Sequence, residues 1–179
     1  MNRNTAIGLP RRAPSTPDRV RQVAMPRAAR ALSTLSRVDY EDAFVVEVGP
    51  ARERTGEQWA RAILEDAPAS MRRALRSGWL ALGLRLGSTR SDRSVLGWQV
   101  RRSTPDFALL AASSRFGLEG EVLVKHQQHT LLVATFVQLE NPIARTVWAG
   151  VAPGHRQVVR NLLEQAAAGS VRRSEMDER

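Results

Sequence analysis

The stretch from Glu121 to Ala168 limits the fold more than any other part of this chain. Two segments rich in β-branched and apolar residues, 121–126 and 130–139, predict strands, and only a few polar residues separate them. Asn141-Pro142 then opens a pattern of helical periodicity that continues to Ala168. We therefore expect an antiparallel hairpin in a sheet that packs against its own C-terminal helix.

The second of these strands is apolar on both of its faces. A strand with one face in water alternates between apolar and polar residues, so this strand is expected to be covered on both sides. The cover is either the helices or the N-terminal arm, or else a second subunit, and the first is the simpler expectation. One face holds Leu131, Val133, Val137 and Leu139, and the other holds Leu132, Ala134 and Phe136.

The chain before the hairpin predicts one strand, two helices and further strands. Residues 42–48 form a β-rich run that ends at Gly49-Pro50, and the residues from Thr55 to Gln58 match a capping box, which opens a helix. A second helix with apolar residues at helical spacing covers 70–86. Strands are predicted over 95–103, 107–112 and 118–126. The order is therefore β-α-α-β-β-β-β-α, an α+β fold in which an antiparallel curved sheet wraps around the long C-terminal helix.

Length and composition fit one globular domain. The chain has 179 residues, of which 42% are hydrophobic and 25% are charged. The absence of cysteine excludes disulfides and thiolate metal sites, and it fits a reducing compartment, so we expect a cytoplasmic protein. Polar residues interrupt every apolar run before it reaches the length of a membrane span; the run 80–84, for example, ends at Arg85.

Positive charge is concentrated at the N-terminus. The net charge is +9, and residues 1–37 contribute eight arginines against one acidic residue, whereas residues 38–170 hold sixteen basic and fourteen acidic residues. We expect a flexible Arg/Pro-rich arm over 1–37, a domain over 38–168 and a charged disordered tail over 169–179. A nearly neutral body predicts no nucleic-acid binding by the fold itself. The arm is either a targeting segment or a flexible segment that docks on nucleic acid or an anionic membrane.

Three segments carry a resemblance to a known superfamily. They are Asp39-Tyr-Glu-Asp-Ala-Phe44, Val95-Leu-Gly-Trp-Gln-Val100, and Asn141-Pro-Ile-Ala-Arg145 leading to Pro153-Gly-His-Arg156. Together they resemble the START-like superfamily, which includes polyketide cyclases and the birch-pollen-allergen-type proteins, and within it a branch known only as a domain of unknown function. The resemblance implies a helix-grip fold over 38–168. It also implies a cavity between the sheet and the last helix that takes up a small apolar or amphipathic molecule.

Such a cavity would be lined by the inner faces of the strands and by the last helix. Pro153-Gly154 lies inside the helical pattern and predicts a kink or a brief break near residues 150–152, which would open space beneath the helix. In a fold without a cavity, most of the same side chains would be plain core. The expected lining is Trp98, Val100, Val122, Val124, Val133, Thr135, Trp148 and His155.

Catalytic motifs with familiar spacings are missing from the sequence. It has no Gly-rich phosphate loop, no His-Glu-x-x-His and no Gly-x-Ser-x-Gly. His126 and His129 flank the predicted hairpin tip with no third ligand in view, so we expect neither a metal nor a cofactor.

His155 is the histidine that the helical pattern directs toward the sheet. It either contacts a ligand, or acts as acid or base in a cyclase, dehydratase or hydrolase, or is satisfied by a neighbouring group. Ligand binding without catalysis is the leading expectation, and an oligomer is left open.

Overall fold

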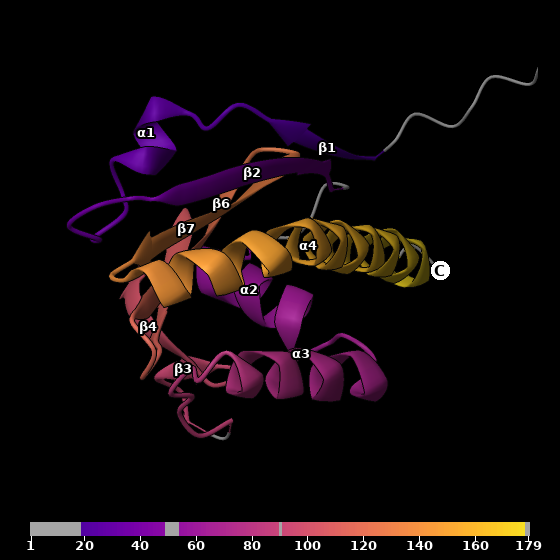
Figure 1. Ribbon diagram of the computed structural model, residues 1–179. Helices are drawn as coiled ribbons and strands as arrows, with labels where there is room; N and C mark the ends of the chain where they lie inside the picture. Colours follow the sequence, from indigo (N-terminus) through magenta and orange to yellow (C-terminus); the bar gives the residue numbers. More distant parts are fainter. Residues whose placement is uncertain (1–18, 49–53, 90, 178–179) are drawn as a thin grey trace, which may run out of the picture.

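The fold is an α+β arrangement of one curved antiparallel sheet and a long C-terminal helix (Figure 1). The structure is a computed structural model that describes residues 19–48, 54–89 and 91–177, with side chains as far as residue 169. The sheet has seven strands in the order β1-β2-β7-β6-β5-β4-β3, and each neighbouring pair is antiparallel.

The elements follow one another in this order: β1 (Val20–Val23), α1 (Arg27–Arg30), β2 (Tyr40–Glu47), α2 (Gly56–Leu64), α3 (Ala69–Ala81), β3 (Ser94–Val95), β4 (Trp98–Ser103), β5 (Phe107–Ser113), β6 (Leu118–Gln127), β7 (Thr130–Leu139) and α4 (Pro142–Asp177). The strand, two helices, antiparallel strands and final helix of the expected order are all present. The sheet has β1 and β3 in addition, and α1 is a further short helix.

The predicted strand over 95–103 is two strands in the structure. Leu96 and Gly97 have positive φ angles of 47° and 98°, and this tight turn pairs Val95 with Trp98 across β3 and β4. A left-handed pair of residues is the backbone of a two-residue hairpin turn. The alternation of apolar residues from 95 to 100 concealed the turn, because Gly97 was its only local signal.

The N-terminal arm was predicted too long, because its described part belongs to the fold. β1 pairs with β2, and α1 lies on the side of the sheet away from α4 (Figure 1). Ala29, Leu32 and Leu35 pack against the outer face of the sheet, which carries Leu123, Leu132, Ala134 and Phe136. The N-terminal segment therefore covers the second apolar face of β7, as the simpler expectation had it. Residues 1–18 lie outside the described residues, and docking of the arm on nucleic acid or a membrane stays a prediction.

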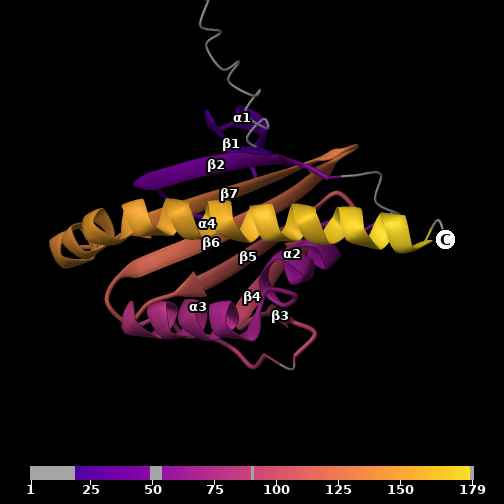
Figure 2. The ribbon, with the colours of Figure 1, turned by 90° about the vertical axis from the view of Figure 1, so that its right-hand side faces the viewer.

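Helix α4 crosses the inner face of the sheet (Figure 2). It is helical through Pro153, so the predicted break is absent. It does change direction. Figure 1 shows its first turns from the side and its last turns foreshortened, whereas Figure 2 shows its last turns from the side and its first turns foreshortened. The helix also continues to Asp177, where a disordered tail from residue 169 was expected.

Helix α2 is fixed to the sheet at its first residue. Thr55 and Gln58 form the predicted capping box, with the Gln58 amide N–H donating to Oγ1 of Thr55 at 3.2 Å and the Thr55 amide donating to Oε1 of Gln58 at 2.9 Å. Gly56 lies directly on the backbone of β5, since a Cβ there would be 2.3 Å from the carbonyl carbon of Phe107. This contact sets α2 beside β5 and β6 and leaves the rest of the inner face to α3 and α4.

Candidate ligand-binding cavity

A cavity of about 560 Å³ lies between the inner face of the sheet and helices α3 and α4. Strands β4, β6 and β7 supply its floor, and the end of α2 closes one side. Its walls are almost wholly apolar, with Thr135 and His155 as the polar side chains apart from the indole nitrogens. Volumes of 300–1,000 Å³ with apolar walls and a few polar groups are typical of small-molecule sites.

Seven of the eight predicted site residues meet around this cavity. Trp98, Val122, Val124, Val133, Thr135, Trp148 and His155 all line it. Val100 does not; it is half-buried against the inner-face core, opposite Leu110 of β5. The alternation along β4 gave the correct face for Val100, but the cavity ends before this residue.

Helix α3 covers the cavity without packing closely on the sheet. Leu75 is its only buried side chain. Its apolar stripe instead faces the cavity, which it lines with Met71, Ala74, Leu75, Gly78, Trp79, Ala81 and, just past the helix end, Leu82. The stripe was visible in the sequence as apolar residues at helical spacing, but its contribution to the cavity lining was missed.

The cavity reaches the surface between α3 and α4. Gly78 of α3 and Gly154 of α4 both line it, and both are exposed. A Cβ at either glycine would meet no atom within 4 Å. Each of the two helices therefore presents a bare backbone position at the opening, with room for a side chain.

One polar cluster is set into the apolar wall. His155 of α4 places its Nε2 3.1 Å from Oγ1 of Thr135 and 3.5 Å from Oδ2 of Asp42. Tyr40 donates its hydroxyl to the same Asp42 oxygen at 2.6 Å. Strand pairing brings these groups together, since Asp42 of β2 lies opposite Thr135 of β7, and Tyr40 shares the inner face of β2 by alternation.

Aromatic rings hold the His155 side chain in place. The imidazole centroid lies 5.4 Å from the Trp148 ring, and the Tyr40 ring meets Trp148 edge to face at 5.1 Å. Arg156 donates to the Tyr40 hydroxyl at 3.4 Å from the other side. The cluster therefore joins the N-terminal half of α4 to β2 and β7.

The cluster perturbs two ionisation equilibria. Burial alone would raise the pKa of Asp42, but the hydrogen bond and charge of His155, with the hydrogen bonds of Tyr40 and Thr135, lower that pKa below its ordinary value. Burial first, and then the hydrogen bond to the Asp42 carboxylate, raises the pKa of Tyr40 to about 12. Asp42 is thus held as a carboxylate and Tyr40 as a neutral phenol.

The hydrogen-bond pattern of His155 limits its chemistry. Asp42 and Thr135 both contact Nε2, and Nδ1 has no hydrogen bond to any residue that the structure describes. A nucleophile triad instead uses the two ring nitrogens separately, one for the carboxylate and one for the hydroxyl. The arrangement is therefore no relay that would activate Thr135, but it orients an imidazole whose second nitrogen is available to a ligand.

Tyr40 and Asp42 were missed as site residues. They lie in the segment Asp39–Phe44, which contributed to the family resemblance but to no assigned role. A signal was present, because Tyr40, Asp42 and Phe44 alternate onto one face, and a charged residue on a core-facing position needs a partner. The sequence could not identify His155 as this partner, because His155 and Asp42 are 113 residues apart in the chain.

Neither a metal centre nor a membrane span is found in the described residues. No group of three or more His, Cys, Asp or Glu side chains among them is placed to hold a metal ion. The imidazole of His126 lies 5.9 Å from the Trp59 ring, centroid to centroid, while His129 is exposed in the turn between β6 and β7. Within the same residues, every helix is too short or too polar to cross a bilayer.

Comparisons of the chain with protein-family models, with curated protein sequences and with solved structures gave no match in any of the three.

Proposed function

We propose that this protein binds a small, mostly apolar molecule in the cavity beneath α3 and α4. The observation that carries the proposal is the cavity itself, about 560 Å³ of space with an almost wholly apolar wall and one polar cluster. A void of this kind leaves its lining without contact partners, and an apolar ligand would supply them. The START-like, helix-grip assignment belongs to the same proposal, and a curved antiparallel sheet crossed by a C-terminal helix supports it.

The polar cluster defines the ligand further. Thr135 and His155 are the hydrogen-bonding side chains on an otherwise apolar wall, so the ligand is amphipathic, with one polar group directed at them. Nδ1 of His155 either donates to a carbonyl or carboxylate oxygen or accepts from a hydroxyl, depending on its protonation. Medium-chain fatty acids and the matching alcohols have this form.

Glycine substitutions at the opening test the proposal. Leucine at Gly154 would occupy the cavity without a backbone clash, whereas Gly150→Leu places the same side chain on the exposed part of the same helix, outside the lining. We expect wild type and Gly150→Leu to bind medium-chain fatty acids or alcohols equally in calorimetry, and Gly154→Leu to bind them at least about tenfold more weakly, because burial of a few methylenes is worth that much.

Native mass spectrometry of protein purified from its own host provides a second measurement. A co-purified amphipathic molecule on wild type that is absent from Gly154→Leu would support the proposal. If wild type carries nothing from its host and binds none of the acids or alcohols, the cavity has no such ligand and the proposal is wrong.

A second candidate function is proton transfer on the bound molecule, and the Asp42–His155 contact favours it. A carboxylate on one ring nitrogen fixes the tautomer and leaves the other nitrogen to take a proton from a ligand and return it. A cyclase or dehydratase fits this arrangement better than a hydrolase with a side-chain nucleophile, since the arrangement does not activate Thr135. His155→Gln should then abolish turnover but only weaken ligand binding, because the apolar lining remains, and unchanged turnover would exclude this role.

A further inference from the structure

A second hollow lies on the outer face of the sheet, the face that does not carry α4. It encloses about 520 Å³. Strands β4, β5 and β6 form its floor, and the described part of the connection from α3 to β3 forms one wall. Leu35, one of the N-terminal residues packed on the outer face, forms the opposite wall. The hollow therefore occupies the part of the outer face that the N-terminal segment leaves uncovered.

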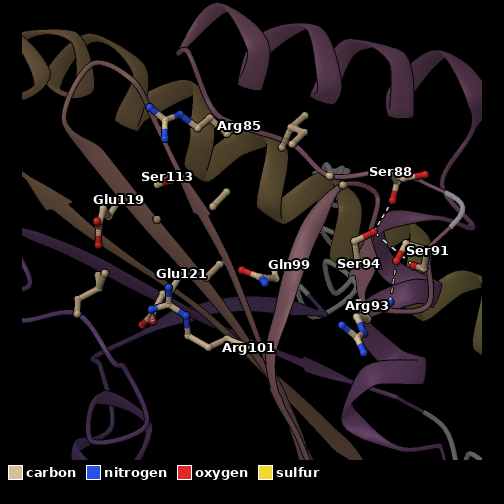
Figure 3. Close-up of a pocket in the computed structure, with 17 residues that line it drawn as sticks. Arg85, Ser88, Ser91, Arg93, Ser94, Gln99, Arg101, Ser113, Glu119 and Glu121 are labelled. Atoms are coloured by element: carbon tan, nitrogen blue, oxygen red, sulfur yellow. Dashed lines mark hydrogen bonds and ion pairs between the residues drawn. The ribbon is translucent and has the colours of Figure 1, made fainter.

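The lining of this hollow is polar and rich in arginine. Arg85, Arg93 and Arg101 come from three different places in the chain and lie on different sides of the hollow, with Gln99 between them (Figure 3). Ser88, Ser91 and Ser113 contribute hydroxyl groups, and Glu119 and Glu121 are the acidic residues. An apolar molecule bound here would remove water from these polar groups without replacing the lost hydrogen bonds, so the hollow disfavours such a ligand.

The charge of Glu121 is already compensated within the protein. Its side chain is fully buried, and it accepts hydrogen bonds from the Ser33 hydroxyl at 2.7 Å and from the amide and hydroxyl of Thr34. Arg101 lies 3.4 Å from the same carboxylate and donates to the Thr34 hydroxyl at 2.7 Å. Arg101 and Glu121 thus neutralise each other and fix the N-terminal segment against the hollow.

Arg85 and Arg93 remain as two guanidinium groups that have no partner among the described residues. Their side chains make no hydrogen bond or ion pair with any residue that the structure describes, and both are exposed. Glu119, half-buried in the same hollow, is the one acidic residue left to oppose them. After the Arg101–Glu121 pair is set aside, the described lining residues leave the hollow with two cations against one carboxylate.

The backbone that carries these two arginines is held to the sheet edge. The Arg85 amide donates to the Ser113 carbonyl at 2.8 Å, and the Gly87 amide donates to the Gly97 carbonyl at 2.7 Å. The Arg93 carbonyl accepts from the Val100 amide at 2.9 Å. Both guanidinium groups are therefore positioned from hydrogen-bonded segments, which lowers the ordering cost of gripping a ligand.

We propose that this outer hollow binds a small polar anion that bears phosphate or carboxylate groups, with Arg85 and Arg93 pairing with its charge. Guanidinium groups bind both kinds of oxyanion through two parallel N–H bonds. Gln99, the serine hydroxyls and Glu119 suit hydroxyl groups on the remainder of such a molecule. The proposal does not depend on the apolar cavity.

Calorimetric titration of the full chain tests this site with inorganic phosphate, pyrophosphate and citrate as probes and glycerol as the uncharged comparison. We expect pyrophosphate or citrate to bind and glycerol not to bind, and the stronger of the two anions to show which oxyanion the site prefers. Arg85→Gln and Arg93→Gln should each weaken binding about tenfold or more, because each removes a charged hydrogen-bonding group. Arg73→Gln removes an exposed arginine of α3 outside the hollow and should leave affinity unchanged.

Two results would overturn the site. One is that no anion binds the wild-type chain, and the other is that the three arginine variants lose the same small amount of affinity, as a general charge effect predicts. Gly154→Leu should bind the anions like wild type, since it changes only the apolar cavity. Failure of the cavity proposal and failure of the anion site are therefore distinguishable in the same set of proteins.

Discussion

Nε2 of His155 lies 3.5 Å from Oδ2 of Asp42, and this contact joins the C-terminal helix to the second strand of the sheet. Asp42 is almost fully buried and shares its carboxylate with Tyr40, so its removal would leave several polar groups without a partner. The stability of the fold and the chemistry of the cavity therefore depend on the same carboxylate.

Asp42→Asn should destabilise the protein at neutral pH by about 1–3 kcal/mol, the cost of unpaired buried polar groups. The folded-state pKa of Asp42 is lowered, so its stabilising contribution is complete above its unfolded value of 3.8 and is lost as pH falls through the folded value. Urea unfolding from pH 7 to pH 3 should show the difference between wild type and variant shrinking below about pH 4. A difference independent of pH would contradict the assigned role.

Tyr40 is the only tyrosine in the chain, so tyrosinate absorbance reports on it alone. Its titration should have a midpoint of about 12 in the folded protein, against about 10 in urea. The folded-state pKa is raised, so the stability contributed by Tyr40 is present below pH 10 and lost as pH rises toward 12; Tyr40→Phe should lack this alkaline loss. Asp42→Asn should move the midpoint downward, and an unmoved midpoint would exclude the Tyr40–Asp42 hydrogen bond as a cause.

Gly56→Ala should destabilise the fold by about 3 kcal/mol or prevent folding, because the new methyl group would overlap the backbone of Phe107. Gly150→Ala is the matched control, since a Cβ there meets nothing and alanine favours a helix by about 0.5–1 kcal/mol. Thermal unfolding monitored by circular dichroism measures both changes. Equal melting temperatures for the two variants would show that α2 does not lie against β5.

Ala29→Asp should detach the N-terminal segment from the outer face, because Ala29 is buried there and a carboxylate would be left without a partner. We expect a loss of more than about 3 kcal/mol, with exposure of the apolar outer face detected as aggregation or dye binding. Ala28→Asp adds the same charge at the exposed neighbouring position and should leave stability nearly unchanged. If both variants behave alike, the segment does not cover the sheet.

The sequence predicted elements whose signals are local. The hairpin of β6 and β7, the capping box at Thr55 and the start of α4 each depend on residues a few positions apart, and the structure has all three. The prediction of a flexible arm was wrong for the described part of the N-terminal segment. Arg and Pro dominate the composition of this segment, as they do in disordered arms. What orders it is pairing with β2 and the buried Glu121, and both contacts are distant in sequence.

The candidate cavity was predicted as far as strand alternation allows. Val122, Val124, Val133 and Thr135 follow from the period of two along β6 and β7. Asp42 did not follow, since its partner is decided by the pairing of β2 with β7 and by the course of α4. The outer hollow was not predicted either, because its arginines come from the connection between α3 and β3 and from β4, which meet around it only in the folded chain.

Gly120 lines both the apolar cavity and the outer hollow. It has no side chain on either face, and the Trp98 ring occupies the space on the inner side, where a Cβ would lie 3.1 Å from one ring atom. At this residue only the backbone of β6 separates the apolar cavity from the charged outer hollow. A displacement of this backbone toward either side would enlarge one of the two spaces and reduce the other, so the volumes of the cavity and the hollow are inversely linked at Gly120.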